Sequence, residues 1–261
     1  MTEASDRLLS VAVEAARAAG DVALKYYRGG FDVTLKPDAT PVTRADLEAE
    51  EIIREIIGRA FPDHGFLGEE FGEEGSREVR WIIDPIDGTK NFVRGIPLWA
   101  VLIGFEEHAV VTAGVILNPV SGDLGTARKG AGAFVNGVRV RVSDEARLGA
   151  ASFVHAGLGL VRPTPYWDGF VRLIDATARQ RGFGDYYGYM LLAEGKAEIY
   201  AELEVKPWDL APAKILVEEA GGRFTDFEGR DSIYSGTALA TNGRLHETVL
   251  SLLARRPAAR P

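Results

Sequence analysis

The chain has 261 residues, of which 46% are hydrophobic and 26% are charged, and its formal net charge at pH 7 is −8. A chain of this length can bury the core of one large domain or of two smaller lobes. The acidic balance argues against nucleic acid as a partner, because phosphate backbones are bound by clustered Lys and Arg. Since there is no cysteine, a disulfide framework, a thiolate nucleophile and a Cys-ligated zinc are excluded.

The sequence carries no pattern of a targeting signal. Its N-terminus has acids early and lacks the basic-then-apolar order of a signal peptide. No apolar run approaches the roughly 20 residues that a membrane span needs. We therefore expect a soluble, cytoplasmic protein that has no membrane partner.

The N-terminal part begins with two predicted helices. Apolar residues recur at helical spacing over residues 3–27 and again over 43–60, where Thr43 is a candidate N-cap, and a loop over 37–41 separates the two helices. A second loop follows and contains Gly68-Glu69-Glu70.

The middle of the chain is rich in predicted strands. We expect strands at residues 79–83, 101–105, 110–117 and 125–128. Asn136-Gly137, between two short apolar runs, is a strong signal for a two-residue hairpin.

The C-terminal part mixes helices with strands. Helical patterns cover residues 166–179, 186–194, 209–220 and 245–253, a strand is expected at 198–201, and the tail 255–261 is expected to fray. This order of elements favours a layered α+β fold with a weak boundary near residue 145. We expect one domain over 1–261, divisible into lobes 1–145 and 146–261.

The most informative stretch is Trp81-Ile82-Ile83-Asp84-Pro85-Ile86-Asp87-Gly88-Thr89. An ordinary Asp-Gly turn explains Asp87, but it does not explain Asp84 at the end of an apolar strand. Two carboxylates on a strand-anchored turn offer the oxygen ligands that Mg2+ prefers. The hydroxyl of Thr89 and the nearby amides could face a phosphate held by the cation. The segment therefore predicts metal-assisted phosphoryl chemistry.

Three further acids, Asp46, Glu69 and Asp209, are candidates for the same site. Each has an ordinary alternative: Asp46 could cap its helix, Glu69 could be solvated in its loop, and Asp209 could stabilise a helix dipole. If the acids converge, two carboxylates 4 Å apart repel by about 4 kcal/mol at an effective dielectric of 20. Bound cations relieve this repulsion at neutral pH, so convergence would predict a metal site.

These motifs resemble those of the inositol monophosphatase family. Its metal sites use a Gly-Glu-Glu loop, an Asp-Pro-Ile-Asp-Gly-Thr turn and a later Trp-Asp before a helix that ends in Glu-Ala-Gly-Gly. The matching segments here are Gly68-Glu69-Glu70, Asp84 to Thr89, and Trp208-Asp209 leading to Glu219-Ala220-Gly221-Gly222, and Val42 to Asp46 resembles the acidic start of the preceding helix. The resemblance spans nearly the whole chain and implies an αβαβα sandwich of the inositol monophosphatase and fructose-1,6-bisphosphatase type.

The resemblance implies a site for two or three Mg2+ ions. One ion would be held by Glu69, Asp84 and the carbonyl of Ile86. A second would be held by Asp84, Asp87 and Asp209, so that Asp84 bridges the two. A third, weaker ion would lie near Glu69.

The resemblance also implies catalytic and phosphate-binding groups. Asp46 and Thr89, with Glu69 beside them, would orient and deprotonate a metal-bound water. The amides of Gly88 and Thr89 would bind phosphate oxygens. Among the metal ligands, Ile86, Asp87 and Asp209 would also border the substrate.

A closer resemblance is to the histidinol-phosphatase branch of this family. It is carried by Lys36 to Thr43, Gly68 to Gly72, Asp84 to Pro97, Arg181 to Tyr186 and Val205 to Ala211, and Lys206-Pro207 departs slightly from the branch pattern. The resemblance implies a Mg2+-dependent phosphomonoesterase that hydrolyses L-histidinol phosphate, a step of histidine biosynthesis.

Histidinol phosphate carries an ammonium and an imidazole, so its pocket should offer carboxylates and an aromatic wall. Asp185 and Glu202 could supply the carboxylates, and Tyr186 and Tyr187 the wall. By resemblance, Arg181 contacts the substrate. Arg181 could equally form a surface salt bridge, and Glu202 could equally be solvated or bind a polyol hydroxyl.

Two alternatives share the family but differ in function. An inositol-1-phosphate or broader sugar-phosphate phosphatase would use the same metal site with a polyol pocket. A remote alternative is the SuhB type, whose members act as RNA-associated regulatory proteins, although the negative charge argues against it. Because dimers are common in the family, we expect a homodimer.

Overall fold

The structure, a computed structural model, describes residues 3–29, 33–35 and 41–254, and the side chains of residues 7–29 and 44–254. Three expectations fall wholly or mostly outside these residues: the loop over 37–41, the capping role of the Thr43 side chain and the frayed tail at 255–261.

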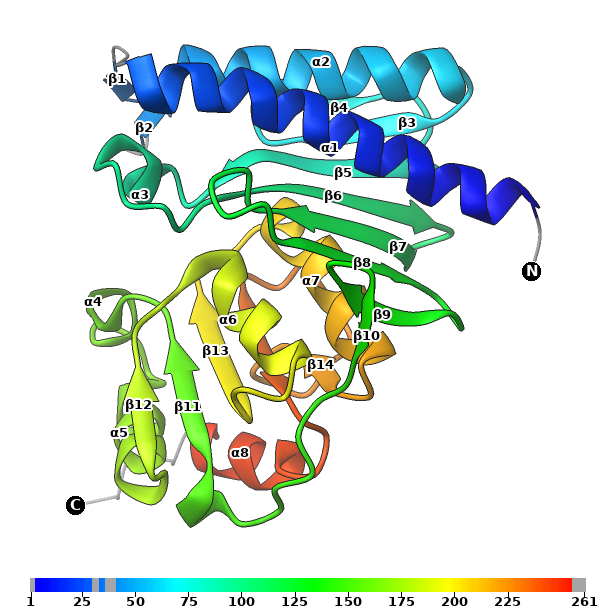
Figure 1. Ribbon diagram of the computed structural model, residues 1–261. Helices are drawn as coiled ribbons and strands as arrows, with labels where there is room; N and C mark the ends of the chain where they lie inside the picture. The colour runs from blue at the N-terminus through cyan, green and yellow to red at the C-terminus, as the bar shows by residue number, and fades with distance from the viewer. Residues whose placement is uncertain (1–2, 30–32, 36–40, 255–261) are drawn as a thin grey trace.

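Five layers alternate helices with sheets (Figure 1). Two helices cover the outer face of a large sheet, two lie between it and a smaller sheet, and two cover the outer face of the smaller sheet. In that order they are α1 (Glu3–Gly29) and α2 (Arg44–Ala60), α6 (Asp185–Ala193) and α7 (Pro207–Glu219), and α5 (Trp167–Ala176) and α8 (His246–Leu253). The predicted layered α+β fold is confirmed.

The large sheet has eight strands among the described residues, in the order β10-β9-β8-β7-β6-β5-β3-β4. Its neighbouring pairs are antiparallel except β3 and β5, which are parallel. The strands are β3 (Gly65–Gly68), β4 (Gly72–Glu74), β5 (Val79–Asp87), β6 (Ala100–Glu107), β7 (Val110–Leu117), β8 (Leu124–Arg128), β9 (Gly132–Val135) and β10 (Val138–Val140). The predicted hairpin is confirmed, since Asn136 and Gly137 both have the positive φ that its tight turn requires.

The small sheet has the order β12-β11-β13-β15-β14. Strand β11 is parallel to both of its neighbours, whereas β15 is antiparallel to β13 and β14. The bounds are β11 (Ser152–His155), β12 (Arg179–Arg181), β13 (Ile199–Leu203), β14 (Arg223–Thr225) and β15 (Thr237–Thr241). The remaining elements are the pair β1 (Val33–Leu35) and β2 (Pro41–Thr43), the short helices α3 (Thr89–Val93) and α4 (Leu158–Val161), and a 3-10 turn at Leu148–Ala150.

Strand β5 is longer than the strand predicted over 79–83, because its pairing with β6 continues to Asp87. The register is irregular between Asp84 and Asp87, the interval that contains Pro85. Proline has no N–H to donate, and at such an interruption the pairing of the strands requires no donor there. Both acids therefore belong to the end of the strand rather than to a separate turn.

The helix predicted to reach Arg179 ends earlier, and residues 179–181 form strand β12 instead. Thr177 is extended, with φ −106° and ψ 150°, and its hydroxyl donates to the Leu173 carbonyl. This closes the helix, and parallel pairing with β11 holds the residues that follow.

Helix α7 packs very closely on the large sheet. Gly104 of β6 and Gly114 of β7 lie beneath it, and a Cβ at these positions would come within 2.5 Å of Ala211 Cβ and 2.7 Å of Pro212 Cα, respectively. Only glycine permits this approach. The N-terminal turn of α7 is thereby brought beside the end of β5.

The predicted boundary near residue 145 lies between β10 and β11, where the chain passes from the large sheet to the small one. Helix α7 of the second part nevertheless packs on the large sheet, and the division into two lobes stays a prediction. No helix in the described part of the chain is both long and apolar enough to cross a membrane.

Candidate active site

The end of β5 is shaped by its own hydrogen bonds. The N–H of Ile86 donates to Asp84 Oδ1 at 3.0 Å, and the hydroxyl of Thr89 donates to the Ile86 carbonyl at 3.1 Å. Gly88 has φ +83°, and a Cβ there would lie 3.0 Å from the Leu98 carbonyl oxygen. Glycine is therefore needed for the chain to turn from β5 into α3.

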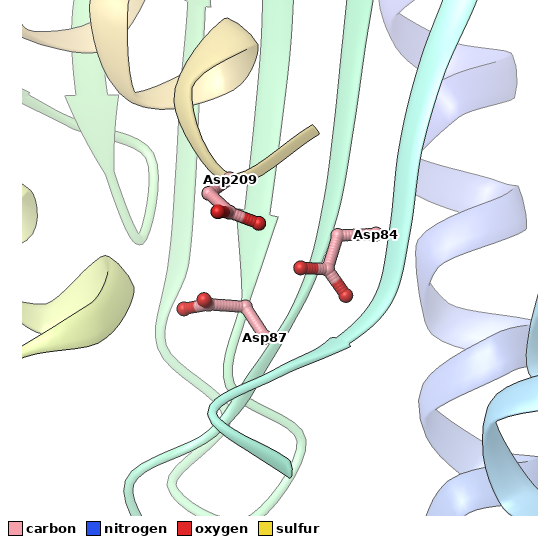
Figure 2. A group of neighbouring side chains, drawn as sticks. All are labelled: Asp84, Asp87 and Asp209. Carbon is pink, nitrogen blue, oxygen red and sulfur yellow. The ribbon is translucent and has the colours of Figure 1, made fainter. Parts of the chain in front are cut away.

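Three carboxylates from two distant segments meet beside this turn (Figure 2). One oxygen from each of Asp84, Asp87 and Asp209 lies within 4.8 Å of the others. Asp84 and Asp87 are 2% and 7% exposed. In the first turn of α7, Asp209 Oδ2 accepts the Lys206 N–H at 2.8 Å, and Asp87 Oδ2 accepts the Tyr186 N–H at 2.6 Å.

Burial is the main cause of a raised pKa at each of these three acids. It raises the pKa of Asp84 and of Asp87 well above the usual range, and that of Asp209 to about 7. The negative charge of Glu69 adds to the pKa shift at Asp84 and Asp209, and the charge of Asp185 adds to it at Asp87. The structure thus places like charges together in a region that water reaches poorly.

Two further carboxylates, Asp185 and Glu202, extend the cluster. Burial raises the pKa of Asp185, the first residue of α6, to about 6, although Lys90 and the Asn91 side-chain amide, 2.9 Å away, oppose this shift. Glu202 of β13 is 8% exposed, and burial with the charges of Asp185 and Asp209 raises its pKa to about 8. Glu202 is therefore not the solvated acid that its sequence allowed.

Glu69 reaches the cluster through strand pairing. The parallel register places Gly68 opposite Ile83, which brings Glu69 level with Asp84. The N–H of Glu69 donates to the Ile83 carbonyl at 3.1 Å. Its position beside the acids is observed, and its role as a ligand stays a prediction.

The residues present fit a divalent cation. Within the described residues, no Lys or Arg forms an ion pair with Asp84, Asp87 or Asp209. Two full charges 4.8 Å apart would repel by about 3.5 kcal/mol at an effective dielectric of 20. Carboxylates, together with a carbonyl such as that of Ile86, form the all-oxygen donor set of hard cations.

The start of α2 lies against the acidic turn. Asp46 is 1% exposed in the first turn of α2, and its neighbour Ala45 packs in one cluster with Ile86 and Phe92. This contact brings Asp46 and Thr89 to the same end of β5, and their joint catalytic role stays a prediction.

The predicted specificity residues are spread more widely. Arg181 is exposed on the edge strand β12, donates to the Gln180 carbonyl, and lines a separate cavity of about 190 Å³ with Phe183 and Tyr187. Tyr186 is 2% exposed and its hydroxyl accepts an N–H from Asn118 at 2.6 Å. Contact of these side chains with a substrate stays a prediction.

Three polar residues that position the site were not singled out in the sequence. Asn91 holds Asp185, Asn118 holds Tyr186, and Glu50 of α2 holds the loop that contains Glu69. Asn91 lies within the Asp84 to Pro97 segment that carries the family resemblance, so the sequence offered a signal that it belongs to the site. Glu50 looks like one of many helix acids, so only the fold reveals its burial.

Comparison with known proteins identifies the family. The sequence profile of the inositol monophosphatase family matches residues 4–258. The chain belongs to this family. Histidinol-phosphatases from Mycobacterium tuberculosis and Streptomyces coelicolor are 45% and 42% identical, over 86% of this chain and 90% and 88% of theirs. An inositol-1-monophosphatase from Mesorhizobium japonicum is 34% identical over 98% of this chain and all of its own.

A solved structure shares the architecture. The extragenic suppressor protein suhB from Bartonella henselae has a TM-score of 0.90 and 34% sequence identity, covering 96% of this chain and 100% of its own. The predicted family and the αβαβα sandwich of its type are confirmed. The protein is a phosphoric monoester hydrolase of the inositol monophosphatase family.

Proposed function

We propose that this protein hydrolyses L-histidinol phosphate to L-histidinol and phosphate, with Mg2+ as its cofactor, as a step of histidine biosynthesis. The observation that carries this proposal is the meeting of Asp84, Asp87 and Asp209, which have no cationic partner among the described residues. The histidinol-phosphatases that are 42–45% identical support the choice of substrate.

Two or three Mg2+ ions would bind the oxygen ligands. Glu69, Asp84 and the Ile86 carbonyl would hold one ion, Asp84, Asp87 and Asp209 a second, and a third would lie near Glu69. When bound, the ions lower the pKa of a water ligand and offset the charge of the attacking and leaving oxygens.

Thr89 and Asp46 would place the attacking water and accept its proton. The hydroxyl hydrogen of Thr89 is engaged by the Ile86 carbonyl, so its oxygen is free to act as an acceptor towards water. Asp46, buried at the start of α2, would then receive the proton. The amides of Gly88 and Thr89 would bind phosphate oxygens.

Charge balance favours a cationic leaving alcohol. Two divalent ions would offset the four acidic ligands, which leaves Glu202 and Asp185, whose charge Lys90 partly offsets, for the substrate. The ammonium and imidazole of histidinol phosphate offer N–H donors to both carboxylates. Burial raises the pKa values of these two acids, and a nearby positive charge would lower them again. Glu202 could also accept a polyol hydroxyl, so Asp185 is the discriminating residue. The role of Arg181 in contacting the substrate rests on the family resemblance alone.

The alternative substrate is inositol 1-phosphate or another sugar phosphate, as the name of the Mesorhizobium japonicum relative suggests. A SuhB-type role is more remote, because the net charge is −8. Specific, saturable binding to RNA polymerase or ribosomal RNA complexes in a pull-down would favour that role instead.

Phosphate release from a substrate panel tests the proposal. With Mg2+ we expect kcat/KM for histidinol phosphate to exceed that for inositol 1-phosphate by about 100-fold, the effect of one or two charge-assisted hydrogen bonds. Excess EDTA should abolish both activities. Equal or reversed preference would reject histidinol phosphate as the substrate while leaving the metal site intact.

We also propose a homodimer, by analogy with the family. Size-exclusion chromatography with light scattering should give a mass of about twice the 28.3 kDa of one chain. A mass of one chain at micromolar concentration would reject the dimer.

A further inference from the structure

A buried acid–arginine pair on α2 lies directly against the loop that carries Glu69. Glu50 is 0% exposed, and its Oε1 accepts the Nε–H of Arg54 at 2.8 Å. The Arg54 side chain is itself only 13% exposed, and its guanidinium lies 5.1 Å from the centre of the Phe66 ring. The pair is therefore an internal part of the fold rather than a surface salt bridge.

The pair binds the backbone of three successive residues just after Glu69. Glu50 Oε2 accepts the Glu70 N–H at 2.8 Å, and Oε1 accepts the N–H of the next residue at 3.4 Å. Arg54 Nη2 donates to the Gly72 carbonyl at 2.8 Å. Charge-assisted bonds of this kind are stronger than neutral ones, so the side chains of α2 hold the backbone of residues 70–72 in place.

Gly68 is the residue that allows this contact. A Cβ at position 68 would lie 1.8 Å from Glu50 Oε1. A side chain at position 68 would have to displace the Glu50 carboxylate, so this carboxylate and the backbone before Glu69 form one close-packed unit. On the other side of that backbone, the Glu69 N–H is bound to the Ile83 carbonyl of β5.

We propose that Glu50 is a positioning residue that fixes Glu69 against Asp84 and thereby sets the Mg2+ affinity of the site. The proposal rests on the proposed function, in which Glu69 is a metal ligand. Groups that hold metal ligands in place typically contribute about 10- to 100-fold in affinity or activity. Glu50 touches neither metal nor substrate, and it acts only through the loop backbone.

The chain contains a matched control for this pair. Glu106 of β6 is 1% exposed, and its Oε2 accepts the Nε–H of Arg80 at 2.7 Å. Arg80 precedes Asp84 by four residues on β5, which is roughly 13 Å along an extended strand. Arg80 also pairs with Glu73 of β4 at 2.9 Å, but the side chain of Glu106 itself bonds to Arg80 and Tyr234 and not to residues 68–72. Glu106→Gln therefore changes a buried acid–arginine pair of the same kind without removing a direct contact to the Glu69 loop.

The experiment is calorimetric Mg2+ titration of metal-free protein, with activity measured over a range of Mg2+ concentrations. In Glu50→Gln, one acceptor oxygen becomes an NH2 group that faces a donor, so the loop loses an anchor. We expect the Kd for Mg2+ to rise about 10-fold or more, and excess Mg2+ to restore kcat with an unchanged KM for substrate. Glu106→Gln should keep the wild-type Kd even if its melting temperature falls.

A second variant keeps the test decisive if Glu50→Gln does not fold. Gly68→Ala displaces the Glu50 carboxylate while leaving the residue in place, and we expect the same weakening of Mg2+ binding. Folded Glu50→Gln or Gly68→Ala protein with the wild-type Kd would overturn the positioning role, as would equal weakening in Glu106→Gln. If the wild-type protein binds no Mg2+, the proposed function is rejected together with the positioning role. If the wild-type protein binds Mg2+ and the folded variants bind it equally well, only the positioning role is rejected.

Discussion

Buried acids occupy two different environments in this molecule. Asp226 is 0% exposed, but it accepts hydrogen bonds from the Arg230 guanidinium and from the N–H groups of Glu228 and Arg230. Burial acts to raise its pKa, yet these donors outweigh burial and the pKa is lowered. Asp84 is 2% exposed, faces other acids, and has a raised pKa.

The difference shows that burial alone does not mark a functional acid. Glu50 and Glu106 resemble Asp226, because each is buried with an arginine of the same chain. The acids at the end of β5 and the start of α7 have no such partner among the described residues. A buried charge that the fold does not neutralise requires a cation from outside, and this requirement distinguishes the candidate metal site.

The largest effect is expected for Asp84→Asn, which removes the proposed bridging ligand. An amide cannot bridge two cations as a carboxylate does, so we expect kcat to fall by about 1,000-fold or more, a loss of about 4 kcal/mol of transition-state stabilisation. The metal-free variant should be at least as stable as the wild type, because one repelling charge is gone. Phosphate release and chemical denaturation measure the two effects, and retained activity would refute the bridging role.

A smaller loss is expected for Thr89→Ala, which removes the proposed acceptor of the attacking water. We expect kcat to fall about 100-fold, the usual size of a general-base contribution, with Mg2+ affinity nearly unchanged. Thr164→Ala is a matched control, since the Thr164 hydroxyl donates to the carbonyl three residues earlier, as Thr89 does. Equal losses in both variants would indicate a local folding effect instead of catalysis.

The Asp185→Asn variant tests the substrate side of the cluster. If Asp185 pairs with a cationic group, the KM for histidinol phosphate should rise about 10-fold, as for the loss of one charged hydrogen bond. Hydrolysis of inositol 1-phosphate by the same variant serves as the control and should change little. A similar loss for both substrates would assign Asp185 to the metal site.

A last effect concerns stability and pH in the metal-free protein, where no catalysis is involved. The pKa values of about 6, 7 and 8 for Asp185, Asp209 and Glu202 exceed those of exposed carboxyls. At these three groups the folded state therefore binds more protons than the unfolded state between about pH 4 and 8, which lowers the free energy of unfolding as pH rises. His246, whose pKa burial lowers to about 4, opposes this trend below about pH 6.5, so the fall is expected above that pH. We expect a loss of about 1–3 kcal/mol between pH 6 and 8 in urea denaturation.

Added Mg2+ should offset this loss at pH 8 more than at pH 6, because the ligands must be deprotonated to bind it. Asp226, whose pKa is lowered, contributes only at lower pH and does not affect the window. Stability that rises with pH from 6 to 8 in the absence of metal would contradict the raised pKa values.

The layers of the fold and the acids of the site could be predicted from the sequence. The polar residues that hold these acids in place could not. Periodicity located α1, α2 and strands β5 to β8 of the large sheet, because these are the longer elements. Short strands such as β12 and β14 were missed, since three residues carry no periodic signal and tertiary pairing alone holds them. The segment after Ala176 was assigned to a helix for the same reason.

The supports of the site depend on contacts between distant segments. Glu50, Asn91 and Asn118 are ordinary polar residues in the sequence, and only the packed structure shows which backbone or side chain each one holds. Asp209 could be placed beside Asp84 only by resemblance. The physical reason for their contact, the glycines beneath α7, requires knowing which strands the helix crosses.

Proton release on Mg2+ binding tests the central claim most directly. Calorimetric titration of metal-free protein at pH 7, repeated in buffers of different ionisation enthalpy, counts the protons that the metal displaces. Because burial raises the pKa values of Asp84 and Asp87 and brings that of Asp209 to about 7, we expect saturable binding that releases protons at pH 7, and fewer at pH 9. Absence of binding at millimolar Mg2+, or binding without proton release at pH 7, would contradict the assignment of these acids to a metal.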